Sequence, residues 1–118
     1  IASADVSIAP DPIETFCLAA LDSLASGTPV VASATSAVGE FLLLDTSEPV
    51  GAVADNNPIA FADAISTVLQ RRAGQKDLPT MCHQQAENYP WSSTLMMMLR
   101  LHGAGKELSV LKRSLKVA

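Results

Sequence analysis

Two carboxylates, with the start of a predicted helix between them, form the part of this sequence best suited to chemistry. Glu14 and Asp22 are eight residues apart, which on a helix is roughly two turns, or about 12 Å along the axis. Apolar spacing predicts that the helix runs from Thr15 to about Ser26. Its N-terminus would present a positive dipole end and unpaired backbone amides, which bind phosphate without a cation. These amides belong to Thr15, Phe16, Cys17 and Leu18.

The two acids and the amides together suit one kind of ligand. A carboxylate accepts hydrogen bonds from both hydroxyls of a vicinal diol. Two carboxylates that flank an amide-rich helix end therefore suit a molecule with a diol at each end and phosphates between them. A nucleotide-sugar has this layout, with its hexose, pyrophosphate and ribose.

The flanking sequence predicts that these residues follow the first strand of a parallel sheet. A strand at 5–9, the helix at 15–26 and a strand at 29–33 form a βαβ unit, for which a right-handed crossover is expected. Open parallel sheets bind ligands beyond the carboxyl ends of their strands, where the loop with Glu14 begins. The whole order predicts an α/β fold, with a Rossmann-like parallel sheet, flanking helices and extra C-terminal helices. The remaining predicted elements are a short helix at 37–44, a strand at 50–54 and helices at 58–72, 79–88, 91–102 and 107–116.

Charge is divided unevenly along the 118 residues, whose net charge is −4. Residues 1–70 contain nine acids and no Lys or Arg, whereas residues 71–118 contain all eight basic residues. This distribution argues against nucleic-acid binding by the acidic half, because such binding rests on Lys and Arg at phosphates. Any phosphate bound there needs backbone amides, a helix end or cations from elsewhere.

Composition narrows the remaining classes of protein. The length fits one domain, and no apolar run approaches the roughly 20 residues of a membrane helix. The two cysteines, Cys17 and Cys82, are expected to be reduced thiols of a cytoplasmic protein, with Cys17 a packing residue and not a nucleophile. His83 and His102 match no metal-ligand spacing, so no metal site is expected.

The segment from Glu14 to Val31, with the sequence ETFCLAALDSLASGTPVV, resembles the Glu-x7-Glu segment of the GT4 family of retaining GT-B glycosyltransferases. The resemblance covers nearly the whole chain. Within the family, the sequence is most similar to GDP-mannose-dependent α-mannosyltransferases of bacterial envelope glycolipids. It continues through Gly39-Glu40, the strand with Gly51, residues 55–69 and Tyr89-Pro90-Trp91.

The resemblance implies a role for each matched residue. Glu14, the catalytic candidate, would hold hydroxyls of the donor hexose, and Asp22 would hold the ribose hydroxyls. The family usually has Gly at position 17 and Glu at position 22. No cofactor or metal is implied beyond the nucleotide-sugar donor. The donor sugar and pyrophosphate would face the amides of Phe16, Cys17 and Leu18.

The resemblance also implies partners. Residues 1–118 would be part of the C-terminal, donor-binding domain of a longer two-domain enzyme, whose N-terminal acceptor domain is absent and without which the fragment is inactive. The family's phosphate-binding Arg and Lys would lie upstream of Ile1. We expect self-association through the C-terminal helices. The basic residues near the C-terminus form either a solvated face or a contact with anionic lipid at the inner face of the membrane: Lys106, Lys112, Arg113 and Lys116.

Two alternatives to a hexosyltransferase stay open. One is a fragment of a GT-B sugar-nucleotide epimerase, whose acid and base carboxylates would lie in the missing N-terminal half. The other is a degenerate Rossmann-like module that keeps the fold as an interaction surface. Cys17 and Asp22, where the family usually has Gly and Glu, favour the second alternative.

Overall fold

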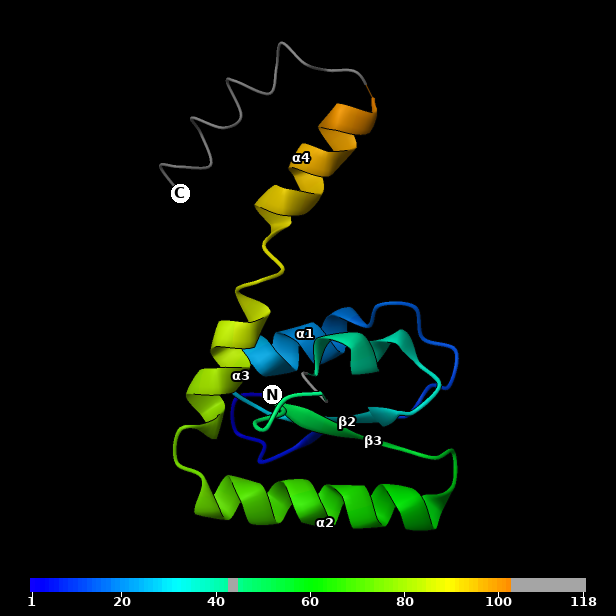
Figure 1. Ribbon diagram of the computed structural model, residues 1–118, viewed down its shortest axis with the longest axis vertical. Helices are drawn as coiled ribbons and strands as arrows, with labels where there is room; N and C mark the ends of the chain where they lie inside the picture. Colours follow the sequence, from blue (N-terminus) through cyan, green and yellow to red (C-terminus); the bar gives the residue numbers. More distant parts are fainter. Residues whose placement is uncertain (43–44, 103–118) are drawn as a thin grey trace. The chain divides into compact units, whose positions relative to one another are not determined.

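A computed structural model describes residues 1–42 and 45–102 of the chain, with its elements labelled in Figure 1. The chain divides into two units, Ile1–Glu87 and Asn88–Ala118. The predicted helix at 107–116 lies outside the described residues. The elements in chain order are β1 (Ser7–Ala9), α1 (Leu18–Ala25), β2 (Val30–Ser33), the 3-10 helix η1 (Ala37–Phe41), β3 (Gly51–Ala54), α2 (Pro58–Gly74), α3 (Leu78–Ala86) and α4 (Trp91–Leu101).

Within the described residues, three strands form a parallel sheet in the order β1-β2-β3. Ser7 of β1 pairs with Val30 of β2, and Val30 pairs with Gly51 of β3. Parallel neighbours require a crossover connection, which α1 supplies between β1 and β2. The predicted βαβ unit and the α/β fold class, with a parallel sheet and flanking helices, are confirmed.

Strand β2 is buried along its whole length because helices cover both faces of the sheet. On one face, Val30 belongs to a core cluster with Leu24 of α1. On the other face, Val31 packs with Val68 of α2. Figure 1 shows α1 and α2 on opposite sides of the sheet. The continuous run of small and β-branched residues in β2 is typical of a parallel strand that is covered on both faces.

Helix α2 begins where its sequence predicted. The Asn57 side chain accepts a hydrogen bond from the amide of Ala60 at 2.9 Å, and Pro58 occupies the first helical position. Arg71 and Arg72 lie in the last turn, where positive charge stabilises the helix dipole. The predicted helix at 37–44 is shorter, since η1 is a 3-10 helix of five residues.

Helix α4 is the described element of the second unit, and none of its residues is buried. Several of its apolar side chains are exposed, and the expected self-association through the C-terminal helices stays a prediction. In the described part of the chain, no helix combines the length and the apolar character needed to span a bilayer. The large apolar side chains exposed on α4 are Trp91, Leu95, Met97, Met98 and Leu101.

Two glycines of contrasting surroundings test the packing of the sheet. A Cβ added to Gly51 in β3 would overlap the backbone carbonyl oxygen of Val30, whereas a Cβ at Gly74 would meet nothing. We expect Gly51→Ala to destabilise the fold by about 3 kcal/mol or more, because a clash with backbone cannot be relieved by side-chain rotation. Gly74→Ala should stabilise it by up to about 1 kcal/mol, because Ala is the better helix former. Urea unfolding followed by circular dichroism measures both, and similar midpoints for the two variants would contradict this packing.

The Cys82 thiol of α3 provides a second test of the core. It is fully buried, and its Sγ donates to the carbonyl oxygen of Val50 at 3.8 Å. Burial raises its pKa from 9.0 to about 11, although Arg72 and Arg71 partly oppose the shift. At pH 8 the thiolate fraction of Cys82 is therefore about 0.1%. We expect iodoacetamide to modify the half-buried Cys17 in the folded chain and Cys82 only after unfolding, as measured by peptide mass.

The same pKa shift makes stability depend on pH. The pKa of Cys82 is higher in the folded chain than in the unfolded chain. The neutral thiol therefore makes its full contribution to the free energy of unfolding below pH 9.0, and this contribution is lost as the pH rises towards about 11. A Cys82→Ala variant should show less of this alkaline loss. In the iodoacetamide experiment, equal rates of modification at Cys17 and Cys82 of the native chain would contradict the burial of Cys82 in the core.

Candidate functional site

Glu14 lies in the loop between β1 and α1, beyond the carboxyl end of β1. This is the location that the sequence predicted. The side chain is half-buried, and its Oε1 accepts a hydrogen bond from the amide of Thr15 at 3.1 Å. The Thr15 amide, predicted as a phosphate donor, is thus engaged by its own neighbour. Among the described residues nothing binds Oε2, so this oxygen can accept a hydrogen bond from a ligand.

The prediction that the helix begins at Thr15 is wrong, since α1 begins at Leu18. Cys17 has φ 60° and ψ 81°, a left-handed conformation that costs a non-glycine residue roughly 1–2 kcal/mol and interrupts a right-handed helix. Tertiary contacts favour this turn: Cys17 packs against the core cluster, and the Phe16 ring lies 5.8 Å from that of Phe41. The rise of about 12 Å predicted between the two carboxylates therefore does not apply, because residues 14–17 are not helical.

The amides at the true start of α1 differ from those predicted. Leu18 and Ala19 are its first two residues, and the first amide to bond within the turn is that of Ala20, which donates to the carbonyl oxygen of Cys17 at 3.1 Å. The amides of Leu18 and Ala19 therefore have no intrahelical acceptor. The sequence pattern predicts the Leu18 amide as a phosphate donor but does not predict that of Ala19. The family usually has glycine at position 17. This preference is the signal that could have indicated a left-handed residue there and a helix that begins at Leu18.

Asp22 lies on an exposed part of α1, one helical turn after Leu18. Its carboxylate pairs with none of the residues that the structure describes. This negative charge lies just beyond the first turn of α1, where the effect of the helix dipole has fallen off. The position leaves Asp22 free to bind hydroxyl groups of a ligand that also reaches the amides of Leu18 and Ala19.

Hydrogen bonds from two other strand ends hold the loop that contains Glu14. Thr35, after β2, donates through Oγ1 to the carbonyl oxygen of Pro12 at 2.8 Å, and the amide of Ala37 donates to the carbonyl oxygen of Glu14 at 3.0 Å. Asn56, after β3, donates through Nδ2 to Oγ1 of Thr35 at 3.3 Å. The sequence pattern does not predict these residues, because the bonds of Thr35 join residues that are 21 and 23 places apart in the chain and belong to no motif.

The Lys and Arg residues of the first unit lie in the last turn of α2 or just after it, at the other edge of the sheet: Arg71, Arg72 and Lys76. Helix α2 starts at the carboxyl end of β3 and runs back, so Arg71 and Arg72 in its last turn lie near the amino edge. Their charges act on Cys82, whose Sγ bonds to Val50 just before β3 begins. Within Ile1–Glu87, Glu14 and the Leu18 amide therefore have no Lys or Arg beside them. A phosphate bound there needs the helix amides and cations from other residues.

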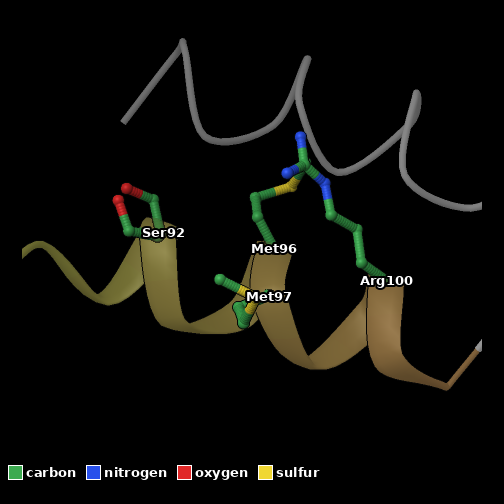
Figure 2. Close-up of a pocket in the computed structure, with 5 residues that line it drawn as sticks. Ser92, Met96, Met97 and Arg100 are labelled. Carbon is green, nitrogen blue, oxygen red and sulfur yellow. The ribbon is translucent and has the colours of Figure 1, made fainter.

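The hollows of the structure include two that residues 14–22 do not line, although the first of them lies at the same carboxyl edge of the sheet. One, of about 480 Å³, lies between the ends of β2 and β3 and the residues around η1. The other, of about 390 Å³, lies along α4 in the second unit, where Met96 and Arg100 project from one side of the helix (Figure 2). Serine, methionine and a single arginine do not provide the carboxylates of a diol site. The α4 hollow is lined by Ser92, Ser93, Met96, Met97 and Arg100.

Known proteins similar to this chain include mannosyl- and glycosyltransferases. It is 44% identical over 104 residues to a GDP-mannose-dependent alpha-(1-6)-phosphatidylinositol dimannoside mannosyltransferase of Mycobacterium tuberculosis, a match that covers 88% of this chain and 26% of that protein. It is 31% identical over 102 residues to a D-inositol 3-phosphate glycosyltransferase of Salinispora tropica, covering 86% of this chain and 20% of that protein. The chain thus spans only about a quarter and a fifth of the lengths of these two relatives.

A solved structure is also similar. Sucrose-phosphate synthase from Thermosynechococcus elongatus superposes with a TM-score of 0.72 at 26% sequence identity, over 86% of this chain and 25% of that one. Residues 1–71 match the profile of the family described as Glycosyl transferases group 1, and this stretch includes Glu14, α1 and all three described strands. The chain therefore belongs to the glycosyl transferases group 1 family.

Proposed function

We propose that this chain is the donor-binding part of a retaining hexosyltransferase, and that residues 14–22 hold the nucleotide-sugar. The observation that carries the proposal is the arrangement at the carboxyl edge of the sheet. Glu14 is held before the start of α1, the amides of Leu18 and Ala19 follow, and Asp22 lies one turn further. This order matches the order of hexose, pyrophosphate and ribose in a nucleotide-sugar.

Each group has a distinct task in this proposal. Oε2 of Glu14 accepts hydrogen bonds from hexose hydroxyls, while Oε1 stays bonded to the Thr15 amide, which orients the carboxylate. The amides at the start of α1 bind the pyrophosphate. Asp22 binds the ribose hydroxyls. The proposal uses no metal and no cofactor besides the donor.

The proposed donor is GDP-mannose, and the proposed acceptor is lipid-linked. The name of the Mycobacterium tuberculosis relative supports both, since that protein is a GDP-mannose-dependent phosphatidylinositol dimannoside mannosyltransferase. We also propose that residues 1–118 form part of a C-terminal domain, and that an N-terminal domain supplies the acceptor site and the missing cations. The short coverage of the relatives supports this division. The proposed location is the cytoplasmic face of the membrane.

The backbone at Cys17 favours an intact site over a degenerate interaction module. The family usually has Gly at this position, and Cys17 keeps the positive φ that glycine adopts readily. Cys17 thus has the kind of backbone conformation that a glycine at this position would adopt without strain. The left-handed turn still leads the chain from Glu14 to the free amides.

Titration with three ligands can separate the proposed tasks of the two acids. Amide chemical shifts of the chain are followed with GDP-mannose, GDP and UDP-glucose, and we expect Leu18 and Ala19 to respond to each at millimolar concentration. Glu14→Gln should lower the affinity for GDP-mannose about tenfold and leave the affinity for GDP unchanged, because GDP lacks the hexose. Asp22→Asn should lower the affinity for both ligands, because one charged hydrogen bond of about 1.5 kcal/mol or more is lost.

Asp63→Asn is the matched control for these acids, since Asp63 is an exposed acid of α2 on the far side of the sheet. Its affinities should equal those of the parent chain. If no nucleotide shifts the amides of residues 14–22 at millimolar concentration, this chain lacks the proposed donor site.

Substitution of Cys17 tests the role of the left-handed turn. Cys17→Gly relieves strain of roughly 1–2 kcal/mol and loses about 1 kcal/mol to the greater freedom of the unfolded chain, so its unfolding free energy should stay within about 1 kcal/mol of the parent. Cys17→Val should destabilise by more than about 2 kcal/mol, because a β-branched residue tolerates positive φ poorly. We expect Cys17→Gly to bind GDP-mannose at least as tightly as the parent. Equal stability of the Gly and Val variants would contradict a left-handed conformation at position 17.

A further inference from the structure

We propose that Thr35 is a positioning residue for Glu14, and that Asn56 and Ser33 fix the direction of its hydroxyl. The inference rests on the proposed function, because it assigns to these residues the placement of the carboxylate that would hold the donor hexose. They lie outside the segment that resembles the family's Glu-x7-Glu motif. They come instead from the ends of β2 and β3.

Two hydrogen bonds hold the backbone on either side of Ile13 and Glu14. Oγ1 of Thr35 donates to the carbonyl oxygen of Pro12 at 2.8 Å, one residue before this pair. The amide of Ala37 donates to the carbonyl oxygen of Glu14 itself at 3.0 Å. Both donors belong to the short segment that follows β2. The backbone around Glu14 is therefore attached at two points to the segment that follows the central strand of the sheet.

The donors and acceptors of the network can be assigned in one direction. The carbonyl oxygen of Pro12 can only accept, so the hydroxyl of Thr35 must donate to it. Oγ1 of Thr35 then accepts from Nδ2 of Asn56 at 3.3 Å. This leaves Oδ1 of Asn56 to accept from the hydroxyl of Ser33 at 2.5 Å. The Ser33 and Thr35 hydroxyl oxygens also lie 3.1 Å apart, but in this assignment each directs its proton to another acceptor. Ser33 is fully buried, so the chain of bonds begins in the core and ends at the loop.

Packing alone does not hold the loop. The side chain of Ile13 is 83% exposed, and Asp11 and Thr15 are exposed as well. The local bond from the amide of Ile13 to Oδ1 of Asp11, at 3.0 Å, shapes the turn but does not attach it to the sheet. Phe16 and Cys17 at the end of the loop pack against Phe41 and the core, but the attachment of residues 11–15 depends on the bonds to Thr35 and Ala37. A misplacement of about 1 Å can cost a binding or catalytic group about 100-fold in effect, so the loss of one attachment should be measurable.

Thr35→Val removes the hydroxyl with little change of shape, and Thr35→Ser restores it. Hydrogen exchange of the Ala37 amide reports on the attachment, and the affinity for GDP-mannose reports on Glu14. In Thr35→Val we expect the Ala37 amide to exchange faster and GDP-mannose to bind about three- to tenfold more weakly, with no change for GDP. Thr35→Ser should restore both values.

Thr67→Val is the matched control. Thr67 is likewise an exposed threonine whose hydroxyl donates to a backbone carbonyl, that of Asp63 at 2.9 Å, but it lies on α2. It should leave both the Ala37 exchange and the GDP-mannose affinity unchanged. A general loss of stability in Thr35→Val would instead raise exchange across β2 and α2.

A double-mutant cycle tests whether Thr35 acts through Glu14. In the Glu14→Gln background, Thr35→Val should cause no further loss of GDP-mannose affinity, because the group that it positions no longer carries a charge. Additive losses would overturn the inference, as would unchanged Ala37 exchange in Thr35→Val. A parent chain that binds no nucleotide-sugar would overturn the proposed function instead, and the Ala37 exchange would still decide whether Thr35 holds the loop.

Discussion

The rest of this structure depends on the parallel pairing of β2 with both of its neighbours. Each residue of β2 is buried, and its pairing with β1 and β3 brings the backbones so close that position 51 has room only for glycine. Parallel pairing forces each connection to cross back over the sheet, so helices must cover its faces. It also gathers the carboxyl ends of all three strands at one edge. The layers, the small core residues and the location of the loops all follow from this arrangement.

The same arrangement converts an uneven charge distribution along the sequence into a separation in space. The loops at the carboxyl edge carry Glu14 and Asp22 lies just beyond them, whereas α2 delivers Arg71 and Arg72 to the amino edge. There the two arginines moderate the effect of burial on Cys82. Among the described residues of Ile1–Glu87, the carboxyl edge thus offers hydrogen-bond acceptors and free helix amides without a Lys or Arg to balance them. A phosphate at this edge would gain no Coulomb attraction from a neighbouring cation of Ile1–Glu87, which supports the proposal that the cations come from another domain.

Sequence reasoning located most of the fold, because the decisive signals were local. The apolar run at Val30 and Val31, the cap at Asn57 and Pro58, and the acids at 14 and 22 depend on neighbours along the chain. Two features did not follow from local pattern. The helix start moved from Thr15 to Leu18 because core packing of Cys17 and the Phe16–Phe41 contact outweighed helical periodicity. The bonds of Thr35 and Asn56 join residues more than 20 positions apart, and threonine and asparagine in loops carry no periodic signal.

The shifted helix start changes how the acid-x7-acid spacing should be understood. If Glu14 and Asp22 lay on one helix, the helix alone would set their relative position, and the spacing would be a sufficient description of the site. Only the part from Leu18 onward is helical, so Glu14 reaches its place through a left-handed turn at Cys17 and through bonds from the segment after β2. The spacing describes a length of chain, and the geometry is set by residues outside it. Two chains with the same spacing can therefore differ in the placement of Glu14 if they differ at Thr35 or Asn56.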